Sequence, residues 1–146
     1  MMVLAFIAIF NSCGSTIALF DQYAYTQTTS LKVDVLNLMD ESSEAYTSHE
    51  TEVATVVSDL MKMREYERHR PKDQITYAMW NKLIDSTGQK GIVGSYMAKW
   101  KADGTEKPAF ITDAKSQVSE GFDYIAELES SKIKSTDSGP QNFLTK

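Results

Sequence analysis

A stretch from Ser15 to Arg70 contains neither glycine nor proline, and this constrains the fold of the chain more than any other feature. Glycine and proline are the residues that most often interrupt helices, because glycine is conformationally free and proline lacks a backbone donor. Within the stretch, apolar residues recur largely at steps of three and four positions, as on one face of a helix: Phe20, Tyr23, Ala24, Leu31, Val35, Leu38 and Met39. The first half of the chain is therefore expected to form long helices.

A turn is expected between two such helices where the apolar residues thin out, over residues 40–48. Thr47 and Glu50 have the spacing of a capping box, which predicts a helix start near Ser48. Pro71 ends this second helix near His69, because a proline disfavours helical conformation in the residue before it. The start of the first helix stays open between residues 13 and 30, because TQTTS at 26–30 dilutes its apolar pattern.

The second half of the chain predicts two short helices and one long helix. The short helices are expected over residues 73–85 and around residues 96–103, separated by a glycine-rich segment, with Gly104 ending the second of them. The long helix starts at Pro108, which a first turn tolerates, and its apolar stripe runs toward Ile133. Residues 135–146 are polar, contain Gly-Pro and predict a mobile tail.

These elements predict an all-α fold, an antiparallel bundle of about three long helices plus one or two short ones over residues 31–134. No segment alternates convincingly as a strand does. Long amphipathic helices can also pair between chains, so the oligomeric state stays open.

Composition excludes several classes of function. With 146 residues the chain has the size of one domain, and its single Cys and two His are too few for a zinc finger or an iron–sulfur cluster. The net charge is −5 and there is no basic block, so the attraction to phosphate that dominates nucleic-acid binding is missing. We expect no metal, no cofactor and no nucleic-acid partner.

The first ten residues, MMVLAFIAIF, carry no charge and are followed by Asn-Ser-Cys-Gly-Ser. Ten residues are too few to cross a bilayer as a helix, but they fit the apolar part of an export signal. The segment Phe10–Ser15 resembles the lipobox of bacterial lipoproteins, most closely the looser form in Bacteroidetes-type proteins. The resemblance implies that residues 1–12 are removed as a signal peptide and that Cys13 carries acyl chains, with residues 13–30 forming a tether or the start of the first helix.

The alternative is that residues 1–20 form a first helix of an intracellular protein, with Cys13 as a small buried residue. The lipoprotein interpretation is favoured, because an isolated apolar decamer has no evident use in the fold, whereas several acyl chains give lasting membrane attachment.

The most suggestive cluster of reactive groups is Glu65, Glu67, His69 and Arg70, near the end of the second helix. Glu65 and His69 share a helix face, but two ligands are fewer than a metal site requires, and a solvated charged helix end is the preferred interpretation. Glycines 88, 91 and 94 could surround a phosphate, but they match no known phosphate-binding motif, and a sharp turn is favoured. The chain is not expected to be an enzyme.

Aromatic residues concentrate in the short helices, where they pack the core or line an exposed groove. The residues expected to form a partner or ligand surface are Tyr77, Trp80, Tyr96, Met97 and Trp100. The function expected from the sequence is that of a small, non-catalytic helical lipoprotein, which binds or contacts a partner in the bacterial cell envelope, periplasmic or surface-facing. The alternative is a carrier that holds an apolar small ligand between the Trp-bearing short helices and the long ones.

Overall fold

The computed structural model describes residues 18, 20–71 and 73–130. This part of the chain contains helices and no strand, which confirms the all-α prediction. The elements are α1 (Gln22–Asp40), a 3-10 turn (Glu41–Ser43), α2 (Tyr46–His69), α3 (Gln74–Leu83), α4 (Gly91–Asp103) and α5 (Pro108–Glu129).

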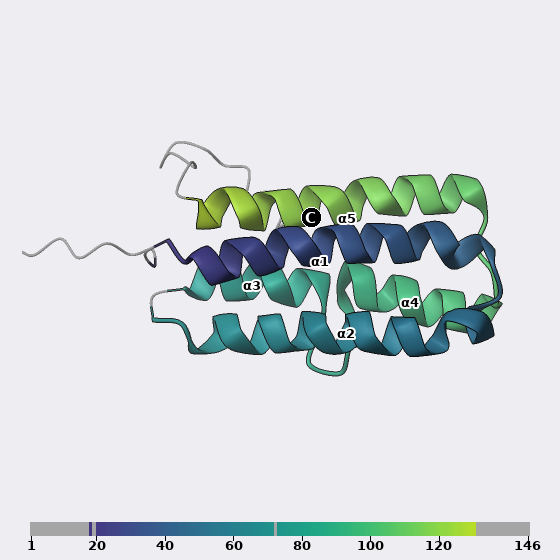
Figure 1. Ribbon diagram of the computed structural model, residues 1–146, viewed down its shortest axis with the longest axis horizontal. Coiled ribbons are helices and arrows are strands. Elements are labelled where there is room, and N and C mark those ends of the chain that lie inside the picture. The colour runs from purple at the N-terminus through teal and green to yellow at the C-terminus, as the bar shows by residue number, and fades with distance from the viewer. Residues whose placement is uncertain (1–17, 19, 72, 131–146) are drawn as a thin grey trace, which may run out of the picture.

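The helices form four antiparallel rows, with α3 and α4 following one another along the third row (Figure 1). Helix α1 packs between α2 and α5, and the row of α3 and α4 also packs against both α2 and α5. As a result, α1 begins, α5 ends, and the connection from α2 to α3 turns at the same end of the bundle (Figure 1). We call this the tether end, because α1, the helix that follows Cys13 in the sequence, begins there.

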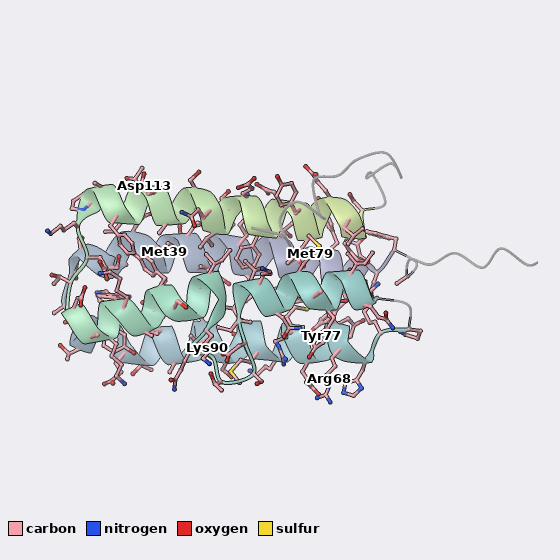
Figure 2. The ribbon with its side chains drawn as sticks, turned by 180° about the vertical axis from the view of Figure 1, so that it is seen from behind. Met39, Arg68, Tyr77, Met79, Lys90 and Asp113 are labelled. Carbon is pink, nitrogen blue, oxygen red and sulfur yellow. The ribbon has the colours of Figure 1, made fainter. Side chains whose placement is uncertain are left out.

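The core runs the length of the bundle and takes side chains from every row. Met39 on α1 and Met79 on α3, both labelled in Figure 2, are completely buried. Trp80 and Trp100 are also completely buried, one in each half of the third row. The Trp80 ring meets Phe122 of α5 edge-on at 5.9 Å between centroids, and Trp100 Nε1 donates a hydrogen bond to Glu44 O at 3.1 Å.

Helix starts follow local sequence at some places and tertiary contacts at others. Asp21 caps α1 by accepting hydrogen bonds from the backbone N of Tyr23 and Ala24, so α1 begins well before Ser30. The capping box predicted for α2 is wrong, because Ala45 occupies the N-cap and no side chain caps the helix. The backbone N of Tyr46 donates instead to Gly104 O at 2.8 Å, so the end of α4 satisfies a donor that a side-chain cap would otherwise serve.

The break between α3 and α4 depends on Asp85 and on glycine. Asp85 Oδ1 accepts hydrogen bonds from the backbone N of Thr87, Gln89 and Lys90, each at 3.1 Å. Gly91 has φ +83°, and a Cβ there would lie 2.6 Å from the backbone carbonyl of Leu83. Gly88 and Gly91 therefore serve a sharp turn, whereas Gly94 lies inside α4. Backbone amides that could have bound a phosphate instead donate to the carboxylate of Asp85.

Several sequence-based predictions lie outside the described residues: the signal peptide over 1–12, the acylated Cys13 and the mobile tail over 135–146. Among the helices in the described ranges, none combines the length and the apolar character that crossing a bilayer requires.

Candidate functional site

The most unusual arrangement of charge in the described residues is a buried cluster around Arg70 at the tether end. The guanidinium contacts three carboxylates: Nη1 lies 2.9 Å from Glu67 Oε2, 2.7 Å from Asp73 Oδ2 and 2.7 Å from Glu129 Oε2. Arg70 Nη2 donates a second hydrogen bond to Glu129 Oε1 at 3.0 Å. The contact with Asp73 Oδ2 is an ion pair without hydrogen-bond alignment. All three acids are at most 5% exposed.

Each member of the Arg70 cluster stands at a helix boundary. Glu67 lies in the last turn of α2 and Arg70 is its C-cap, where Pro71 ends the helix. Asp73 is the N-cap of α3, and Glu129 is the last residue of α5. The cluster thus joins the end of α2 and the start of α3, which are adjacent in sequence, to the distant end of α5.

Asp21, the N-cap of α1, adds the fourth helix end. Its backbone N donates to Glu129 Oε1 at 2.6 Å, and its Oδ2 lies 3.7 Å from Arg70 Nε. Tyr66 Oη donates to Asp21 Oδ2 at 2.5 Å. This hydrogen bond lowers the pKa of Asp21 and raises the pKa of Tyr66 to about 12.

Three buried carboxylates exceed the charge that one guanidinium can neutralise. Burial, and then the neighbouring Asp73 carboxylate, raise the pKa of Glu67 to about 8. Burial alone would lower the pKa of Arg70, but the hydrogen bonds that it donates to Glu129 and the charges of Glu67 and Asp73 raise this pKa. Glu67 therefore carries a proton at neutral pH, and Arg70 stays charged.

The chemistry of the Arg70 cluster is that of a structural junction. Oxygens of Glu67, Asp73 and Glu129 lie within 4.8 Å of one another and are of the type that hard divalent cations prefer. The Arg70 guanidinium, however, contacts all three carboxylates and already supplies the positive charge. A divalent cation would have to displace a buried arginine, so we assign the cluster a role in holding the helix ends together.

The sequence predicted part of this cluster but not its burial. Glu65 and His69 share a face as predicted, with His69 Nε2 2.9 Å from Glu65 Oε1, and both are exposed. Glu67 and Arg70 were expected in the same solvated helix end, and that expectation is wrong because Glu67 is buried and the Arg70 side chain is only 10% exposed. Asp73 and Glu129 were missed, because nothing local in the sequence marks an acid that turns inward.

The aromatic residues proposed as one partner surface are not brought together on one face. Trp80, Met97 and Trp100 lie in the core. Tyr77 lines a groove of about 870 Å³ beside α2, where its hydroxyl accepts a hydrogen bond from Arg64 Nη2 at 2.8 Å. Tyr96 lines a different groove, between α4 and α5.

The groove between α4 and α5 has a volume of about 1010 Å³. Its apolar wall includes Phe110, which stacks on Tyr96 with ring centroids 5.6 Å apart and planes 3° from parallel. Lys99 Nζ lies 4.7 Å from the Phe110 ring centroid and also contacts Glu106 Oε2 at 3.0 Å. Tyr96 belongs to the surface predicted from the sequence. Phe110, which is 36% exposed in the structure, was not part of that prediction.

Comparison of this chain with known protein families, with curated proteins and with solved structures found no match in any of the three.

Proposed function

We propose that this protein is a small helical lipoprotein of the bacterial cell envelope, held at a membrane through acyl chains on Cys13, whose bundle acts by binding. The observation that carries the proposal is the uncharged decamer Met1–Phe10 followed directly by Asn-Ser-Cys-Gly-Ser. The position of α1 is compatible with it, because Gln22 begins the helix nine residues after Cys13 and leaves a short connection.

A binding role, rather than a catalytic one, is favoured by the state of the acidic residues. The carboxylates of Glu67, Asp73 and Glu129 are buried around Arg70, where a substrate in solution does not reach them. The open grooves beside α2 and α4 are lined by a mixture of apolar, aromatic and charged side chains, which can contact a bound partner.

Metabolic labelling with a fatty acid in a bacterial host tests the anchor. Wild-type protein is expected to take up the label and Cys13→Ala to lose it, while Ser12→Ala serves as a matched control that keeps the cysteine. Absence of label from wild type and Cys13→Ala alike would remove the proposal.

The second candidate function is a carrier of an apolar small ligand, and the groove between α4 and α5 favours it. Its volume of about 1010 Å³ and the partly exposed ring of Phe110 suit an apolar molecule. Native mass spectrometry of protein from its natural source should then show a bound molecule that is lost in Phe110→Ser. A wild-type spectrum without added mass would contradict the carrier function.

A further inference from the structure

Exposed apolar side chains gather at the tether end of the bundle. Among the described residues, six large apolar side chains are exposed, and four of them lie at this end: Phe20, Tyr23, Tyr66 and Ile75. Phe20 and Tyr23 are 48% and 54% exposed, and the Tyr23 ring meets Tyr66 edge-on at 5.0 Å between centroids. We call these four residues the end patch.

The residues of the end patch lie at the ends of three helices and just before the first of them. Tyr23 stands in the first turn of α1, Tyr66 in the last turns of α2 and Ile75 in the first turn of α3. A hollow of about 470 Å³ beside Tyr23 and Tyr66 extends to Pro71. The rings therefore lie on the outside of the bundle end and do not continue the core.

Most of the acidic residues at the tether end are engaged in contacts within the fold. Glu67, Asp73 and Glu129 are buried on Arg70, and Asp21 is occupied by Tyr66 and by the N-terminal turn of α1. The exposed Glu65 is paired with Arg68 and His69. A chain with net charge −5 thus presents the rings of the end patch beside two exposed carboxylates, Glu65 and Glu127.

The length of the connection limits how far this end can lie from an anchor at Cys13. Asp21 follows Cys13 by eight residues, which span at most about 29 Å when fully extended. Tyrosine and other amphipathic rings favour the headgroup region of a bilayer, where the ring is apolar and the hydroxyl is hydrated.

From these observations we propose that the end patch rests in the headgroup region of the membrane that holds Cys13, so that the bundle stands on its tether end. The inference rests on the proposed function, because it takes the acylated Cys13 as the anchor. It orients the molecule: the opposite end, where α4 ends and α5 begins, faces away from the lipid. Figure 2 shows the two ends, with Arg68 at the tether end and Asp113 at the far end.

The test uses the full-length acylated protein in vesicles of phosphatidylethanolamine and phosphatidylglycerol. Intact mass first establishes whether Cys13 carries lipid, and an acylated Cys13 has no free thiol to react with a label. A fluorophore is then attached through Ile75→Cys at the tether end or through Lys107→Cys at the far end; Lys107 is exposed before α5. Lipids with brominated headgroup-proximal acyl carbons should quench the fluorophore at position 75 and leave position 107 unquenched.

A paired variant tests the rings themselves. Phe20→Ser with Tyr23→Ser, whose side chains make no hydrogen bond in the described structure, should reduce quenching at position 75 to the level at position 107. Val33→Ser removes an equally exposed apolar side chain, 55% exposed in the middle of α1, and should change nothing. Circular dichroism confirms that each variant is folded.

The outcomes separate the two proposals. If the protein is acylated but quenching is equal at positions 75 and 107, the anchor stands and the end patch is not a lipid contact. A second copy of the chain covering the end patch would overturn the lipid contact in the same way. An intact protein mass without added lipid on Cys13 overturns the proposed function itself, and the inference about the end patch is then overturned too.

Discussion

At the scale of single residues, the Arg70 side chain holds the most carboxylates together among the ion pairs of the described residues. It is 10% exposed and contacts carboxylates from three helix boundaries. Removing one partner of a buried ion pair leaves the other charges without compensation, which costs more than the pair itself contributes.

Arg70→Met is therefore expected to lower the free energy of unfolding by about 3–5 kcal/mol. Arg68→Met is the matched control, because Arg68 pairs with Glu65 at 3.4 Å on an exposed helix face, and its loss should cost about 0.5 kcal/mol or less. Urea denaturation of both variants at pH 7 measures the difference, and equal losses would contradict the structural role of the cluster.

Glu67 makes stability depend on pH in a direction opposite to that of most acids. Its pKa is raised to about 8 in the folded protein from an ordinary value of 4.5, so between these values the folded state holds a proton that the unfolded state has released. Stability contributed by the protonated carboxyl is complete below about pH 4.5 and is lost as the pH rises toward 8.

Glu67→Gln keeps the shape of the protonated carboxyl and cannot ionise. Wild type is expected to lose stability relative to Glu67→Gln between about pH 5 and pH 8, and the difference between them should level off above that range. Chemical denaturation of both proteins across this range measures the difference in their free energies of unfolding. The titration of His49 and of other groups that both proteins share cancels in this difference. A constant difference at all pH values would show that Glu67 is already ionised in the folded state.

At the scale of the elements, the turn between α3 and α4 requires glycine at position 91 for two reasons. Its φ of +83° is strained for other residues, and a Cβ would meet the Leu83 backbone at 2.6 Å. Gly104, at the end of α4, has nearly the same φ, +82°, but a Cβ there would meet nothing within 4 Å.

Comparing the two glycines separates conformational strain from steric overlap. Gly104→Ala should cost about 1 kcal/mol from backbone conformation alone. Gly91→Ala should lower the free energy of unfolding by about 1–3 kcal/mol more than Gly104→Ala does, because the α3 backbone must shift. Thermal unfolding of the two variants measures this, and an equal loss would mean that the turn adjusts freely.

Element boundaries set by local chemistry could be predicted from the sequence, and those set by distant contacts could not. Pro71, Gly104 and Pro108 mark helix ends where the structure has them. The capping box failed because Tyr46 finds its acceptor at Gly104, which no local pattern reveals. The same limit applies to the candidate site: Glu67 and Arg70 were noticed, but Asp21 and Glu129 meet across 108 positions.

At the scale of the whole molecule, the broken third row and the three continuous helices share one core. Trp80 and Trp100 lie in separate short helices, yet both are completely buried against neighbouring rows. A single core of this size is expected to unfold in one cooperative step.

The variants Trp80→Phe and Trp100→Phe each leave one tryptophan as a reporter of one half of the third row. Within each variant, tryptophan emission and the helical circular dichroism signal should give the same urea midpoint. If emission from the half containing α4 changed well before the helical signal, that half would be a separately unfolding unit.

The contact between Asp21 and Glu129 also has a consequence for the order of folding. This contact joins α1 to α5 and closes a loop of 108 residues, so it can form only when the first and last helices are docked. We expect the Arg70 junction to be absent from the rate-limiting transition state, so that Arg70→Met speeds unfolding and leaves the refolding rate nearly unchanged. Stopped-flow kinetics would then identify this junction as a latch that closes last and sets how long the native bundle persists.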